Sequence, residues 1–259
     1  MERFDWLEVD KAKPKPDSPP GETFDGRHYL DKAEAAYRRG NYEFALRHYG
    51  KALNEDPNTP EAWTGQVLCL AELGEFDEAK LWANKALDRF PQCADLLAVK
   101  ALVAAKLGDS QDAMTLSDRA IAKKDAAGRV WLLRGLTLLC LGPSGNHEGC
   151  FIKAKEEGSR DGYAELRIGM GYLEKGDAPH AKEMLERAAE MDSENPLAWR
   201  RLGECCERLF AYGRAQVCYG RALALDTEAK DDLLAAVSRL QNRGFGDWLA
   251  SLFKRNHGA

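Results

Sequence analysis

Residues 196–222 read PLAWRRLGECCERLFAYGRAQVCYGRA, and this stretch decides the fold. Its first half places Trp199, Leu202 and Gly203 on one stripe of a helix, and its second half does the same with Ala215 and Ala222. Small residues on both stripes let two helix backbones approach closely. The stretch therefore predicts a pair of short amphipathic helices that pack against each other.

The same pattern recurs along the chain with a period of 34 residues. Tryptophan recurs at twice this period, at Trp63, Trp131 and Trp199, and a second alanine series is interrupted at His147. A fixed period of this length predicts stacked helix–turn–helix units, in which a glycine with left-handed backbone ends each first helix. The residues that keep the period are the glycines Gly40, Gly74, Gly108, Gly142 and Gly176 and the alanines Ala52, Ala86, Ala120, Ala154, Ala188 and Ala222.

This placement of Trp, Gly, Ala and Pro resembles the tetratricopeptide repeat family over residues 26–228. The resemblance implies an all-α, right-handed α-solenoid of six repeats, followed by a capping helix at residues 229–243 with Leu233, Leu234, Val237 and Leu240 on one stripe. Within residues 142–150, two additional glycines and a proline predict that the second helix of the fourth repeat begins late or frays. The six predicted repeats are 26–59, 60–93, 94–127, 128–161, 162–195 and 196–228.

Composition and motifs argue for a cytoplasmic binding protein. A net charge of -5 offers no basic surface for nucleic acid, and the first residues lack the basic, apolar pattern of a secretory signal. The seven cysteines show no CxxC spacing, which indicates reduced thiols. The five histidines have no partners at catalytic or metal-binding spacing, so we expect neither an enzyme nor a cofactor.

The expected binding surface is the concave groove of the repeats, lined by positions five, nine and twelve of each first helix. In the middle repeats these positions form an apolar ladder, whereas the sixth repeat is charged there. One interpretation is a groove for an apolar or amphipathic segment of a protein partner; the other is that neighbouring first helices bury the ladder as core. The predicted groove residues are Leu68, Leu102, Leu132, Leu136, Leu139, Leu166, Met170, Leu173, Arg200 and Glu204.

The predicted function is thus a protein-interaction scaffold or adaptor. Family members that grip an acidic chaperone C-terminus use a Lys, Asn and Arg clamp, and the matching positions here hold other residues. Arginines at the ends of the groove are expected to set the direction of the bound segment. At the positions that match the clamp, this sequence has Leu30, Glu34, Gly65, Asp95 and Val99.

Two tails outside the repeats resemble ligands for such a groove. Residues 1–25 join an aromatic cluster to a proline-rich linker, residues 244–259 carry an amphipathic stripe, and Asp-Trp-Leu occurs in both. They either cover the ends of the solenoid, gate its groove, or bridge chains in a self-assembling protein; contact with a membrane surface is the least favoured alternative. The tail anchors are Phe4, Trp6, Leu7, Phe245, Trp248, Leu249, Leu252 and Phe253.

Overall fold

The computed structural model describes residues 25–124, 126–142, 146–226 and 231–240. These residues form helices and turns and contain no strand, as the all-α prediction requires. A further helix occupies residues 231–240. The bounds of the other helices are α1 Gly26–Arg38, α2 Tyr42–Glu55, α3 Pro60–Glu72, α4 Phe76–Arg89, α5 Ala94–Lys106, α6 Ser110–Ile121, α7 Gly128–Leu141, α8 His147–Glu157, α9 Tyr163–Glu174, α10 Ala178–Met191, α11 Pro196–Arg208 and α12 Tyr212–Leu225.

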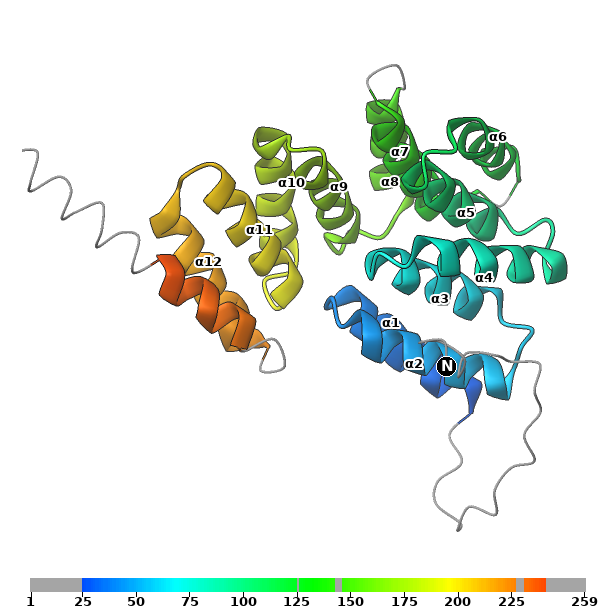
Figure 1. Cartoon of the computed structure of the whole chain (residues 1–259), viewed down its shortest axis with the longest axis horizontal. Helices are drawn as coiled ribbons and strands as arrows, with labels where there is room; N and C mark the ends of the chain where they lie inside the picture. Colours follow the sequence, from blue (N-terminus) through cyan, green and yellow to red (C-terminus); the bar gives the residue numbers. More distant parts are fainter. Residues whose placement is uncertain (1–24, 125, 143–145, 227–230, 241–259) are drawn as a thin grey trace, which may run out of the picture. The chain divides into compact units, whose positions relative to one another are not determined.

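The chain divides into two compact units, Met1–Gly158 and Ser159–Ala259. The first unit contains α1 to α8, and the second contains α9 to α12 with the helix at 231–240. In each unit, an odd-numbered helix packs against the even-numbered helix that follows it, and that helix packs against the next odd-numbered one (Figure 1). This is the stacking of helix pairs that the 34-residue period predicts.

Four of the first five repeats make the predicted turn at a left-handed glycine, whereas Gly142 of the fourth repeat has an extended ψ of -170°. Gly40 and Gly108 have φ of 85° and 84°, and Gly142 has 113°. The backbone N–H of Asn41 donates to the carbonyl of Ala36, five residues earlier, at 3.0 Å. This is the 6→1 hydrogen bond of a Schellman turn. Glycine suits this position because a Cβ would clash with the backbone when φ is positive.

The sixth repeat makes the same turn without glycine. Phe210 has a φ of 59°, and the residue is 76% exposed. Its N–H donates to the carbonyl of Glu207 at 3.0 Å, and that of Ala211 donates to the carbonyl of Cys206 at 2.9 Å. The repeat therefore keeps its hydrogen bonds while holding an aromatic residue in a strained conformation.

Phe210→Gly is expected to stabilise the protein by about 1 kcal/mol, because glycine adopts this conformation without strain. Thermal unfolding followed by circular dichroism measures the change. The matched control is Gly176→Ala at the same position of the fifth repeat, where φ is 79° and no atom beyond the adjacent residues lies within 4 Å of the new Cβ, so only the local backbone strain is tested. That substitution should lower the melting temperature. A Phe210→Gly variant that melts at or below the parent protein would contradict the strain argument.

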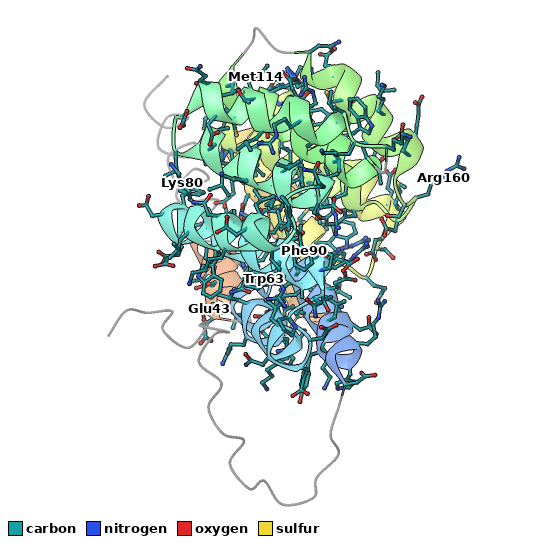
Figure 2. All side chains as sticks on the ribbon, turned by 90° about the vertical axis from the view of Figure 1, so that its right-hand side faces the viewer. Glu43, Trp63, Lys80, Phe90, Met114 and Arg160 are labelled. Carbon is teal, nitrogen blue, oxygen red and sulfur yellow. The ribbon has the colours of Figure 1, made fainter. Side chains whose placement is uncertain are left out.

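The alanines of the repeat and Trp63 lie in the core, whereas Trp131 and Trp199 are partly exposed. The first alanine series is buried throughout, from Ala52 to Ala222, where helices cross. The indole N–H of Trp63 donates to the carbonyl of Pro57 at 2.9 Å, and that of Trp199 donates to Ser193 at 2.8 Å. Trp63 and Trp199 thereby each connect the start of their own repeat to the end of the preceding one. In Figure 2, Trp63 lies among the helices of the first unit, whereas Met114 lies at the edge of that unit.

Of two less regular elements, one follows the sequence and the other follows it only in part. The second helices of the other repeats begin just after the turn, whereas α8 begins later, at His147, as the glycines and proline predict. The helix at residues 231–240 buries Leu233 and Leu240 but leaves Leu234 exposed. Its apolar stripe is therefore narrower than the sequence suggests.

Candidate protein-binding surfaces

Most of the predicted groove residues are buried. Within the first unit, α5 packs directly on both α3 and α7, so neighbouring first helices use this face for contact with each other. Leu139 is half-buried. This burial favours the alternative in which the apolar ladder is core. The residues at most 5% exposed are Leu68, Leu102, Leu132, Leu136, Leu166, Met170 and Leu173.

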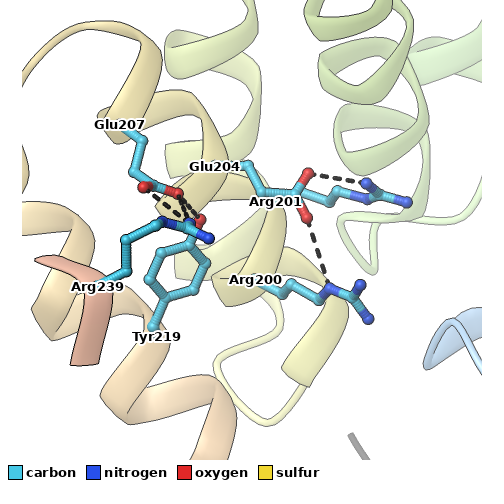
Figure 3. Close-up of polar contacts among 6 residues, drawn as sticks. All are labelled: Arg200, Arg201, Glu204, Glu207, Tyr219 and Arg239. Carbon is cyan, nitrogen blue, oxygen red and sulfur yellow. Dashed lines mark hydrogen bonds and ion pairs between the residues drawn. The ribbon is translucent and has the colours of Figure 1, made fainter. Parts of the chain in front are cut away.

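The charged end of the predicted groove stays accessible on α11. The side chains of Arg200, Arg201 and Glu204 are 37%, 27% and 27% exposed. A terminal nitrogen of Arg201 lies 2.8 Å from Glu204, whereas Arg200 approaches the same carboxylate at 3.5 Å through Nε (Figure 3). One carboxylate thus contacts two guanidinium groups, so these three side chains together carry one excess positive charge.

A second polar cluster on α11 is structural. The hydroxyl of Tyr219 donates to Glu207 at 2.6 Å, and Arg239 donates to the same carboxylate at 3.0 Å (Figure 3). Burial, reinforced by the hydrogen bond to Glu207, raises the pKa of Tyr219, so the phenol stays protonated and donates. Glu207 therefore connects α11, α12 and the helix at 231–240. Its carboxylate already accepts hydrogen bonds from Tyr219 and Arg239.

The first unit carries a pocket on the outward side of α2. It has a volume of about 430 Å³. Phe44 and His48 stack with their ring centroids 4.0 Å apart, and His48 Nδ1 lies 3.0 Å from the carbonyl of Phe44. We call this surface the α2 pocket, and its lining residues are Phe44, Arg47, His48, Gly50, Lys51 and Asn54.

Arg47 and Lys51 make the α2 pocket cationic, and their charges also act on His48. Partial burial is the main cause that lowers the pKa of His48, and the charges of Lys51, Lys32 and Arg47 act in the same direction, while the Phe44 carbonyl opposes them. Lys51 Nζ also lies 5.6 Å from the ring centroid of Tyr29. The pocket thus combines aromatic faces with positive charge, a combination that suits an acidic segment with aromatic side chains.

Sequence reasoning missed the α2 pocket because it considered only the first helix of each repeat. The available signal lay in the second helices: Arg47 and Lys51 stand one turn apart on a face that is opposite the buried stripe of α2. Comparing equivalent positions of the repeats would have found this pair.

Other predicted features fall elsewhere. Among the described residues, no group of three or more His, Cys, Asp or Glu is placed to hold a metal ion. No described helix is long and apolar enough to cross a bilayer. The tail anchors lie outside the described residues: Phe4, Trp6, Leu7, Phe245, Trp248, Leu249, Leu252 and Phe253.

Comparison with known proteins agrees with the repeat geometry. The model of the tetratricopeptide repeat family matches residues 30–94 and 166–231, which together make about half of the chain. The chain belongs to the tetratricopeptide repeat family. Proteins with this fold are generally non-enzymatic scaffolds, and the fold of this chain supports a general role as a scaffold for protein interactions.

Individual relatives extend the comparison. A TPR repeat-containing protein of Dictyostelium discoideum is 30% identical over 111 residues, which cover 40% of this chain and 42% of that protein. The match thus spans less than half of the relative's length. A tetratricopeptide repeat protein from Parabacteroides merdae aligns with a TM-score of 0.53 at 18% identity, over 85% of this chain and 86% of that one.

A protein of a known assembly has a similar fold. A chain of the APC/C hetero-tetramer Cut9–Hcn1 aligns with a TM-score of 0.51 at 15% identity, over 88% of this chain and 44% of that one. At such low identities, the likeness to these two structures shows the fold alone.

Proposed function

We propose that this protein is an interaction scaffold that binds a carboxylate-bearing segment of a partner protein along α11. The observation that carries the proposal is the contact of Arg200, whose Nε lies 3.5 Å from the Glu204 carboxylate while its terminal nitrogens point away from Glu204 (Figure 3). Its two terminal amino groups remain available to form a fork with a second carboxylate. Arg201 lies one residue away and adds positive charge.

The ion pairs on α11 are weak enough to be shared. Partly exposed pairs contribute only about 0–1 kcal/mol, so a partner carboxylate can approach the two arginines at little cost. Glu204 then orients the guanidinium groups rather than neutralising them. Because the contact is electrostatic and near the surface, we expect the affinity to fall as salt concentration rises.

The burial of the apolar ladder changes the expected partner. An apolar segment in the middle of the groove would have to displace leucines that already pack between helices, such as Leu102 and Leu136. The proposal therefore places recognition at the charged end of the groove. Gating by the tails and self-assembly through them remain predictions, and concentration-dependent light scattering of the whole protein would test the second.

Charge reversal on α11 tests the proposed function. A random peptide library displayed on phage is selected against the whole protein, and the selected peptides are expected to be enriched in Asp and Glu. Arg200→Glu combined with Arg201→Glu should weaken binding of these peptides by roughly tenfold or more, because it replaces attraction with repulsion.

The matched control reverses two arginines elsewhere on the second unit. Arg160 and Arg187 are exposed, and Arg160→Glu with Arg187→Glu changes the net charge by the same amount. This control should retain the selected peptides. Selected peptides without acidic enrichment, or acidic peptides that bind equally well to both double variants, would overturn the proposal.

A further inference from the structure

We propose that residues 1–10 of this chain dock in the α2 pocket of the same molecule. The inference concerns the first unit and is independent of partner binding on α11. The proposed binding site for residues 1–10 is thus the α2 pocket and not the apolar groove that the sequence suggested. Its support comes from the comparison of the repeats, the chemistry of the segment and the point at which the segment joins α1.

The α2 pocket is unusual among the second helices of this chain. Arg47 and Lys51 place cations at two positions one turn apart, and Phe44 precedes them on the same face. No other repeat has cations at both of these positions. The equivalents of Phe44, Arg47 and Lys51 are Glu78, Leu81 and Lys85 in α4; Asp112, Thr115 and Arg119 in α6; Asn146, Gly149 and Lys153 in the fourth repeat; His180, Glu183 and Arg187 in α10; and Arg214, Val217 and Arg221 in α12.

Residues 1–10 have the complementary composition. The segment has four acidic residues, at positions 2, 5, 8 and 10, and one basic residue, at position 3. Phe4 and Trp6 supply aromatic rings, and the stacked rings of Phe44 and His48 offer a flat apolar surface for one of them. The acidic side chains then approach Arg47 and Lys51, which are exposed.

The point of attachment favours binding within one molecule. A Cβ added to Gly26 at the start of α1 would lie 3.6 Å from the Cβ of Glu55, so the chain enters α1 beside the end of α2. Residues 11–24 span up to about 46 Å when extended, whereas α2 is about 21 Å long. The linker therefore reaches every part of the pocket, and tethering raises the effective concentration of the segment.

The C-terminal tail fits the pocket less well. It repeats Asp-Trp-Leu at residues 247–249, but it has no other acidic residue and carries Lys254 and Arg255. These cations would be repelled by Arg47 and Lys51. We therefore assign the pocket to residues 1–10.

Photo-crosslinking in the full-length chain tests this assignment. Trp6 is replaced by the photoreactive residue p-benzoylphenylalanine, the protein is irradiated at low concentration, and cross-linked peptides are identified by mass spectrometry. The expected product is an intramolecular cross-link to residues 44–54. Arg47→Glu with Lys51→Glu should reduce its yield by roughly fivefold or more, since the attraction becomes repulsion.

Rescue and control variants make the test specific. Adding Asp5→Lys and Glu8→Lys to the reversed pocket should restore the cross-link, because the charges again match. Thr115→Glu with Arg119→Glu, at the equivalent exposed positions of α6, should leave it unchanged. Circular dichroism confirms that each variant is folded.

Cross-links from position 6 to other helices or to a second chain would overturn the proposal. So would a yield that does not respond to charge reversal, because the segment would then not be held by the pocket. If the photoreactive group is placed at Trp248 instead, a stronger cross-link to residues 44–54 would assign the pocket to the C-terminal tail and contradict the inference.

Discussion

Leu136→Asp is expected to unfold much of the first unit instead of selectively abolishing partner binding. Leu136 is 5% exposed on α7, a helix that packs against α5, α6 and α8. The substitution removes a buried apolar side chain and introduces a carboxyl group without a partner. We expect a loss of about 4 kcal/mol or more in the free energy of unfolding.

Chemical denaturation and circular dichroism measure this loss, and Leu139→Asp is the matched control. Leu139 lies on the same helix but is half-buried, so its substitution should cost much less.

Burial should raise the pKa of the carboxyl introduced by Leu136→Asp above its unfolded value near 4. The destabilisation should therefore grow as the pH rises above about 4 and shrink in acid. If Leu136→Asp leaves the melting curve unchanged, the ladder is an open groove after all.

Gly203→Ala is expected to destabilise the sixth repeat although alanine favours helix. A Cβ at position 203 would lie 2.6 Å from Cε1 and 2.7 Å from Cδ1 of Tyr219. That ring is buried, and its hydroxyl is held by Glu207 at 2.6 Å, so it has little freedom to move. Overpacking of this kind costs about 1–3 kcal/mol, which exceeds the gain of up to about 1 kcal/mol from helix propensity.

Gly220→Ala provides a control of opposite sign. Gly220 lies within α12, and a Cβ there would contact no atom within 4 Å. Its substitution should therefore stabilise the protein by about 0.5–1 kcal/mol through helix propensity alone. Thermal unfolding of the two variants compares the effects directly. Equal stabilisation by both substitutions would show that Tyr219 accommodates the added methyl group.

The candidate site was predictable only in part. Arg200 and Glu204 are accessible on the face of α11 where the sequence predicts them, because charged side chains rarely become core. For Leu102 and Leu136 the sequence allowed two interpretations, since an apolar stripe identifies a buried face but not what covers it. The contact of α5 with α3 and α7 favours packing between helices. The α2 pocket depends on how the rings of Phe44 and His48 stack, and the periodicity of the sequence does not predict that side-chain arrangement.

By itself, the sequence determined the repeat: its 34-residue period, the turns at Gly40 and its equivalents, the buried alanines and the late start of α8. These are local features, because a turn that needs positive φ or a helix stripe of period 3.6 is set by residues a few positions apart. Only the tertiary structure decided that the chain divides after Gly158, that the leucine ladder is covered, and that Phe210 keeps the turn without glycine. The first two outcomes depend on packing between segments far apart in the chain, where the sum of many contacts outweighs any local preference. The turn at Phe210 is kept by its hydrogen bonds to Glu207 and Cys206 against the local preference for glycine.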